Sequence, residues 1–201
     1  AGRTYVVFGS TSAFPADFNL ATINGTNGFA IEGDTTSLNL GFSGADTGDF
    51  NGDGFDDLIV STPAGGIASS PGQSYVIFGQ GSAFSAALSI ASLDGTNGFE
   101  LLGEDAGDDA GFNVSGVGDV NGDGFDDILI GARSADAGGS LRGVAYLLFG
   151  RSGVFAASID LDSIAGNGGI QINGISSNDR AGRYVSEAGD VNGDGFDDLL
   201  V

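Results

Sequence analysis

The chain has 201 residues, of which 38 are glycine, and its 27 acidic residues outweigh six arginines to give a formal charge of −21. It has neither cysteine nor histidine, which excludes disulfides, zinc or copper sites with thiolate or imidazole ligands, and His- or Cys-based catalysis. The negative charge excludes a protein that tracks nucleic-acid phosphates, and no apolar run approaches the roughly 20 residues that cross a bilayer.

Short apolar segments separated by glycine and aspartate follow one another along the chain, without a helical period. Residues 2–9 match the strand that ends the later repeats. Between residues 83 and 93 we expect no more than one helical turn, because Gly and Asp interrupt it. The central repeat has further strand-like segments at Phe99–Leu102, Phe112–Val117, Asp127–Ile130 and Tyr146–Phe149. The pattern predicts about four short strands per repeat.

An internal repeat is the strongest feature of the sequence. The dipeptide FG begins at residues 8, 78 and 149, and an acidic stretch begins at residues 49, 119 and 190 as DFNGDGFDDLIV, DVNGDGFDDILI and DVNGDGFDDLLV. The phrase TNGF at 26 and 96 is answered by residues 166–169. The copies differ in length by one residue, which we place in the Gly/Ser-rich loop between Ile130 and Tyr146. Such regular spacing indicates a structural repeat.

Four-stranded units repeated along a chain predict an all-β fold, a β-propeller. We divide the chain into a last or closing strand at 1–9, repeats at 10–79 and 80–150, and a third repeat at 151–201 that lacks its last strand. About three blades fall below the usual four to eight. We therefore expect a piece of a longer protein with a larger ring, or alternatively two copies that close a ring together. The chain starts without Met, so any targeting segment is expected to lie outside it.

Each acidic stretch has the composition of a calcium loop. In residues 49–57, oxygen-bearing side chains occupy positions 1, 3, 5 and 9, and glycine at position 6 permits a sharp turn. Calcium takes six to eight oxygen ligands, whereas the small octahedral shell of magnesium suits such a loop poorly. The carbonyl at position 7 and the carboxylate at position 9 would complete the site. The sequence therefore predicts about three Ca²⁺ ions, one per loop.

The loops have two alternative interpretations. An EF-hand needs a bidentate Glu at position 12, but Val60, Ile130 and Val201 stand there, so that motif is excluded. A single copy of the motif could be an Asx-rich turn with solvated carboxylates. Three copies with the same ligand types favour calcium, since three or four clustered carboxylates repel one another without a cation.

Positions 7 and 8 of the loops receive different predictions. Alternation along an extended chain turns the position-8 aspartates away from the ion, as solvated or turn-stabilising residues. Replacing Asp126 with Ala is therefore expected to change calcium affinity little, whereas replacing Asp123 should weaken one site. The position-7 phenylalanines and the FG phenylalanines are both expected in the core between blades. The position-8 aspartates are Asp56, Asp126 and Asp197, and the position-7 side chains are Phe55, Phe125 and Phe196.

The FG dipeptides, the acidic loops and the repeat length together resemble FG-GAP repeats, the units of the integrin α-subunit propeller, and above all their bacterial multi-repeat forms. The resemblance spans essentially the whole chain, although the GAP part is not literal and Arg183 replaces the Phe found at 42 and 112. It implies calcium-binding loops on one face of a propeller used for extracellular adhesion. The implied ligands are Asp49, Asn51, Asp53, Phe55 (carbonyl) and Asp57; Asp119, Asn121, Asp123, Phe125 (carbonyl) and Asp127; and Asp190, Asn192, Asp194, Phe196 (carbonyl) and Asp198.

The leading functional hypothesis is a calcium-stabilised interaction module at the cell surface or outside the cell, with a protein or glycan partner. The alternatives are a structural spacer without a specific ligand and a propeller of a polysaccharide-acting protein. Catalysis is not expected, because adjacent carboxylates such as Asp56-Asp57 face opposite sides of a strand, although an unrepeated acid such as Glu187 would suit it. No nucleic acid and no membrane insertion are expected. Arginines clustered on one face would favour binding, but the six are scattered along the sequence.

Overall fold

The computed structural model describes residues 2–33, 39–63, 70–135, 141–166 and 168–201. Within these ranges the chain forms 14 strands and three 3₁₀ helices. The helices have three residues each: η1 (Leu20–Thr22), η2 (Ile90–Ser92) and η3 (Leu161–Ser163). The predicted loop between Ile130 and Tyr146 lies partly outside the described residues. Asn167, in the third counterpart of the TNGF phrase, lies wholly outside them.

The strands form four sheets, each bounded by glycine-rich turns. The first has the order β1 (Arg3–Val7), β2 (Gly28–Glu32), β6 (Ala87–Ser89). The second has the order β11 (Ser158–Asp160), β7 (Gly98–Leu102), β5 (Gln73–Ile77), β4 (Asp57–Thr62), β3 (Gly44–Gly48). The third has the order β12 (Gly169–Asn173), β10 (Val144–Leu148), β9 (Ile128–Ala132), β8 (Ala110–Gly116). The fourth pairs β13 (Ser186–Gly189) with β14 (Asp198–Leu200).

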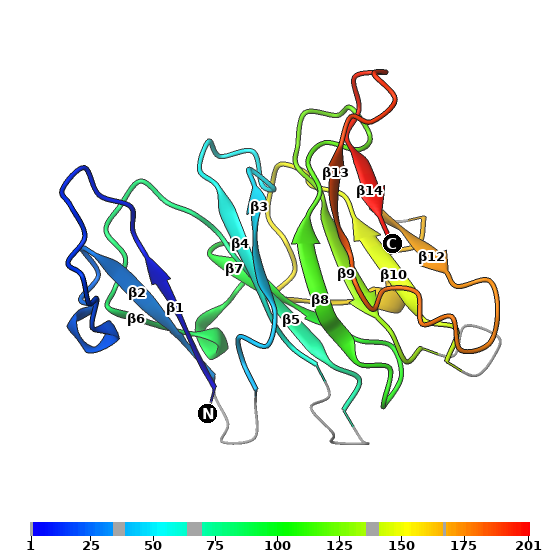
Figure 1. Cartoon of the computed structure of the whole chain (residues 1–201), viewed down its shortest axis with the longest axis horizontal. Coiled ribbons are helices and arrows are strands. Elements are labelled where there is room, and N and C mark those ends of the chain that lie inside the picture. Colours follow the sequence, from blue (N-terminus) through cyan, green and yellow to red (C-terminus); the bar gives the residue numbers. More distant parts are fainter. Residues whose placement is uncertain (1, 34–38, 64–69, 136–140, 167) are drawn as a thin grey trace.

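These sheets confirm the all-β prediction and are those of propeller blades. The second and third sheets each contain a four-stranded antiparallel meander, and β11 adds to the second as a parallel edge strand. Figure 1 shows the sheets side by side in chain order, and the described part of the chain forms an open series of blades, not a closed ring. Strand β8 contacts both β3 and β13, so the first strands of successive sheets lie next to one another.

The sheets do not coincide with the sequence repeats. Strands β3, β4 and β5 precede Gly79, whereas β7 follows it and pairs with β5 in the same sheet. In the third sheet β12 likewise lies beyond Gly150 and pairs with β10. Each full sheet thus crosses a boundary between two repeats counted from the FG dipeptide. The division at residues 79 and 150 describes the sequence period, and the repeat limits stay a prediction.

Burial explains why the two middle strands of the third sheet are almost wholly apolar. All residues of β9 and β10 are buried, because both faces of the third sheet are covered by its neighbours. Between the second and third sheets, the rings of Phe99 and Phe155 stack with centroids 4.9 Å apart, and Phe50 packs 5.4 Å from Phe155. Such aromatic pairs add to the stabilisation from buried area. The FG residue Phe78 belongs to this core, as predicted.

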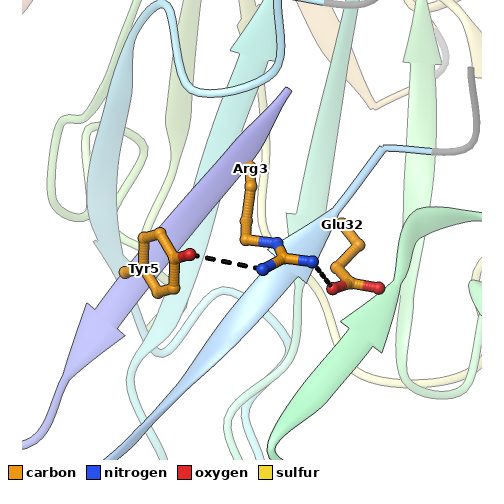
Figure 2. Close-up of polar contacts among 3 residues, drawn as sticks. All are labelled: Arg3, Tyr5 and Glu32. Carbon is orange, nitrogen blue, oxygen red and sulfur yellow. Dashed lines mark hydrogen bonds and ion pairs between the residues drawn. The ribbon is translucent and has the colours of Figure 1, made fainter. Parts of the chain in front are cut away.

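The first sheet is tied together at the end where β1 begins. Arg3 faces Glu32 across the β1–β2 pair and makes an ion pair with it, and its guanidinium also donates to the Tyr5 hydroxyl (Figure 2). Both contacts raise the pKa of Arg3, the hydrogen bond with Tyr5 most. The pair is exposed, so its contribution to stability is small. No helix in the described ranges is long and apolar enough to span a membrane.

Candidate metal centre

The three acidic stretches occupy the same place in three successive sheets. Loop 1 (residues 49–57) joins β3 to β4, loop 2 (119–127) joins β8 to β9, and loop 3 (190–198) joins β13 to β14. Because these strands run in the same direction in each sheet, the loops line one edge of the series, at the top of Figure 1. The sequence-predicted ligands of all three copies therefore lie along one edge.

Inside loop 1, side-chain oxygens bind backbone N–H groups of the turn. The Asp49 carboxylate accepts from Asp53 and from Gly54, each at 2.9 Å. Asn51 Oδ1 accepts from the Asp53 N–H at 2.8 Å, and Asp53 Oδ1 accepts from the Phe55 N–H at 3.0 Å. The chain reverses at Gly54, whose φ of 89° is left-handed and suits glycine.

Loops 2 and 3 repeat this pattern. Asp119 accepts from the N–H groups of Gly122, Asp123 and Gly124 at 2.7, 3.1 and 2.8 Å. Asp190 accepts from the corresponding groups of loop 3 at 2.6, 3.1 and 2.9 Å. These bonds, the one from Gly195 most of all, lower the pKa of Asp190. The first aspartate of each loop is thus an anchor for the turn that follows.

The last aspartate of loops 1 and 2 is buried and fixed at both oxygens. Asp57 accepts from the Gly79 N–H at 2.8 Å and the Asn51 N–H at 3.2 Å, while being only 2% exposed. Burial raises its pKa from 3.8 to about 7, the two N–H groups act in the opposite direction, and the charges of Asp53 and Asp49 raise it further. Without a cation, ionisation of this carboxyl is therefore costly.

Asp127 in loop 2 has the same environment. It is fully buried and accepts from the Gly150 N–H at 2.9 Å and the Val120 N–H at 3.1 Å. Burial raises its pKa to about 7, with smaller contributions from Asp123 and Asp119. Two loops of one chain therefore hold a buried carboxyl within the field of two further carboxylates.

The chemistry of the donors fits calcium, although the side chains do not converge around a common point. In the ranges that the structure describes, no three acidic side chains are gathered as they are around a bound metal ion. Asn51 and Asp53 instead bind each other, from Nδ2 to Oδ2 at 3.0 Å. The donor set is oxygen only, however. Burial chiefly, and the charges of Asp53 and Asp49 in addition, raise the pKa of Asp57, and a divalent cation would offset both effects.

The structure corrects the prediction for position 7 and shows which turn the position-8 aspartates contact. Asp56 is exposed as expected, but Asp126 accepts from the Asp49 N–H at 2.8 Å and Asp197 from the Asp119 N–H at 3.1 Å. These two residues bind the neighbouring loop, which lies 77 or 78 residues earlier in the chain.

The position-7 rings are not part of the core. Phe55 and Phe196 are 44% and 43% exposed, and Phe125 is half-buried. Phe125 and Phe196 pack between blades as predicted, but at the loop surface, against Gly52 and Gly122 of the preceding loops. Phe55 instead lies against Gly79 and Gly81, in the turn after β5 of its own sheet. The interior is filled instead by Phe50, at position 2 of loop 1.

Sequence reasoning missed a gathering of arginines at the opposite edge. Arg133 and Arg142 flank the ends of β9 and β10 there, and the Arg180–Arg183 segment joins the same edge through the Gly143–Ala181 bridge. Arg133 pairs with Asp109 at 3.1 Å and covers the Phe112 ring, 3.6 Å from its centroid. These positions are scattered in the sequence. They meet because Arg133 follows β9, Arg142 precedes β10 and the Arg180–Arg183 segment is bridged to Gly143, which the sequence pattern does not show.

Comparison with known proteins agrees with this architecture. The FG-GAP repeat profile matches residues 42–77 and 110–148. The chain is 34% identical to the phosphatidylinositol-glycan-specific phospholipase D of Dictyostelium discoideum, over 76% of the chain and 17% of that protein. It is 27% identical to integrin alpha-4 of Xenopus laevis, over 76% of the chain and 13% of that protein. It is 28% identical to integrin alpha-PS2 of Drosophila melanogaster, over 81% of the chain and 10% of that protein.

The chain thus spans less than a fifth of the length of these relatives. What they share with it is one stretch of similar sequence. Taken with the FG dipeptides and the four-stranded sheets, the matches identify the chain as an FG-GAP repeat protein.

Proposed function

We propose that the chain is a calcium-binding interaction module of an extracellular or cell-surface protein, and that the ion stabilises the edge loops of its blades. The proposal rests chiefly on Asp57 and Asp127. Each is the last residue of an acidic loop. Burial raises its pKa, and two further carboxylates of the loop raise it further. A carboxylate in this position is stable when a cation balances the cluster, and oxygen-only donors select a hard cation.

The residues that would hold the ion are those of the sequence motif. In loop 1 they are Asp49, Asn51, Asp53, Asp57 and the carbonyl of Phe55, and loops 2 and 3 supply the equivalent sets. Bound calcium would supply positive charge and oxygen coordination. The chain itself fixes the first ligand residue through the N–H groups of the turn and the last through the FG glycine.

The interaction role is supported by the opposite edge of the sheets. Phe42 is 53% exposed and packs against Phe112 with ring centroids 5.3 Å apart. Tyr184, which follows Arg183 in the chain, is 69% exposed. Exposed aromatic and arginine side chains are typical of binding surfaces. We propose a protein or glycan partner and no catalytic role.

Metal-stripped protein tests the proposal. Calcium at millimolar concentration is expected to raise the melting temperature by several degrees, since a ligand that binds only the folded state stabilises it. Magnesium at the same concentration should raise it much less. No effect of either ion would show that the carboxylates form only solvated turns, and an equal effect of both would contradict the selectivity for calcium. An array of glycans and proteins, probed with calcium-loaded and chelated chain, tests the interaction role separately.

A further inference from the structure

Consecutive acidic loops are joined by hydrogen bonds from one blade to the next. The Asp49 N–H at the start of loop 1 donates to Oδ2 of Asp126 in loop 2 at 2.8 Å. The Asp119 N–H at the start of loop 2 donates in the same way to Oδ2 of Asp197 in loop 3 at 3.1 Å. In both pairs the main chain reciprocates, because the Asp126 N–H donates to the Asp49 carbonyl at 3.5 Å and the Asp197 N–H donates to the Asp119 carbonyl at 3.3 Å. Both acceptors stand at position 8 of their own loop.

Aromatic packing accompanies each of these bonds. The ring of Phe125 lies against Gly52 so closely that a Cβ there would collide with it, and Phe196 lies in the same way against Gly122. From the same neighbouring blade, next to Gly150, the Arg151 N–H donates to the Phe50 carbonyl at 3.0 Å. Loop 1 is therefore held from outside its own sheet at its first, second and fourth residues.

We propose that Asp126 and Asp197 are positioning residues that couple each calcium loop to the loop of the preceding blade. The inference rests on the proposed calcium function. Asp49 anchors loop 1 through its carboxylate, and Asp126 fixes the backbone N–H of that same residue. Asp126 is also the chain neighbour of Asp127, a proposed ligand of loop 2. An ion in loop 2 therefore orders Asp126 and prepares loop 1, and by linkage an ion in loop 1 favours binding in loop 2 equally.

Asp56 provides a matched control within the chain. It has the same sequence position in loop 1 and the same charge, but it is exposed, and the described residues give its carboxylate no hydrogen-bond partner. Replacing Asp56 or Asp126 with Ala removes one negative charge from the loop edge in either case. Only the Asp126 substitution removes a bond to a neighbouring loop.

The test is a calcium titration of the full chain followed by NMR, with the amide signals of Gly54 and Gly124 reporting on loops 1 and 2. In Asp126→Ala we expect the midpoint at Gly54 to rise about tenfold, the effect of losing one charge-assisted hydrogen bond. The midpoint at Gly124 should change by less, although Asp126 belongs to loop 2. Asp56→Ala should shift neither midpoint appreciably, and Asp126→Asn, which keeps an acceptor oxygen, should restore most of the affinity at Gly54.

Each other outcome overturns the inference. A shift confined to Gly124 would make Asp126 a residue of its own loop, and equal shifts in the Asp56 and Asp126 variants would indicate a general charge effect. A loop 1 calcium affinity as low in Asp126→Asn as in Asp126→Ala would also indicate a general charge effect. If Asp126→Ala does not fold, Asp123→Asn tests the coupling instead, because a weakened loop 2 must raise the Gly54 midpoint. A wild-type chain without any calcium response would refute the proposed function and this inference together. If the wild-type chain binds calcium and the Gly54 midpoint is the same in Asp126→Ala, the inference alone is refuted.

Discussion

The backbone N–H of Gly79 donates a 2.8 Å hydrogen bond to Oδ1 of Asp57, the last residue of loop 1. Gly150 and Asp127 form the same bond in the next blade at 2.9 Å. The two sequence signatures of the repeat, separated by 22 or 23 residues, thus meet in space because they stand at the same end of adjacent antiparallel strands. The FG glycine holds the root of the acidic loop.

Replacing Gly79 with Ala is expected to destabilise the protein by about 1–3 kcal/mol, the usual effect of overpacking. A Cβ there would collide with the Asp56 carbonyl and approach the Phe55 Cβ to 2.8 Å. Gly9 is the matched control, since it ends the first FG dipeptide but has nothing within 4 Å of its Cβ position. Chemical denaturation should show a loss for Gly79→Ala and little change for Gly9→Ala. Equal effects of the two substitutions would argue against the close packing of FG glycine and loop.

The metal-free protein should lose stability as the pH rises from about 4 to above 7. Burial raises the pKa of Asp57 and of Asp127 from 3.8 to about 7. A carboxyl whose pKa is higher in the folded state stabilises the protein fully below its unfolded value, and this contribution is lost as the pH rises through the folded value. Each unit of difference is worth about 1.4 kcal/mol. Between pH 5 and pH 8, melting temperatures in a chelator should fall by about 5 °C or more.

Calcium should abolish most of that decrease, because the cation favours the ionised carboxyls. Melting curves with calcium at the same two pH values provide the control. A metal-free protein that becomes more stable between pH 5 and pH 8 would show that these carboxyls ionise without penalty. The buried Asp57 and Asp127 would then not have the raised pKa on which this prediction rests.

Asp53→Asn should abolish or strongly weaken calcium binding at loop 1 alone. The substitution removes a proposed ligand charge but keeps an oxygen that can accept from the Phe55 N–H. Since Asp53 is exposed, metal-free stability should change by no more than about 0.5 kcal/mol. Asp56→Asn, which removes the same charge from a residue outside the ligand set, should leave the loop 1 affinity unchanged. Calcium titration of both variants decides whether position 5 or merely the net charge matters.

Phe155→Ala should destabilise the chain by about 3–5 kcal/mol whether or not calcium is present. The ring is 4% exposed and stacks on Phe99 at 4.9 Å in the core between two sheets. Phe14, which is 53% exposed, offers a control substitution of the same kind. Denaturation with and without calcium is the measurement. A loss seen only in the metal-free protein would place Phe155 in the loop network and not in the core.

The repeat period made the fold predictable. Glycine-bounded apolar segments at a spacing of 70 and 71 residues already indicated short strands, and β7, β8, β9 and β10 lie where those segments stand. The assignment of strands to sheets was not visible, because a period shows which segments are equivalent and not which of them pair. The period alone therefore did not predict that β7 pairs with β5 across a repeat boundary.

The loops were predictable as units, but their surroundings were not. Alternation along a strand predicted that Asp56 and Asp126 are solvated or stabilise a turn. Asp56 is exposed, but the rule could not show that Asp126 binds a turn of another blade. Local patterning describes one loop at a time, whereas the contacts at position 8 depend on how neighbouring sheets pack. The arginines near Arg133 and Arg142 meet for the same reason.

Calorimetric titration of the metal-stripped chain with calcium tests the central claim most directly. We expect saturable binding with one ion per acidic loop, so about three per chain, and a higher melting temperature at the end of the titration. The absence of both binding heat and a change in melting temperature would contradict the account. The acidic loops would then be hydrogen-bonded turns of a repeat fold, held by their own backbone N–H groups and by the FG glycines.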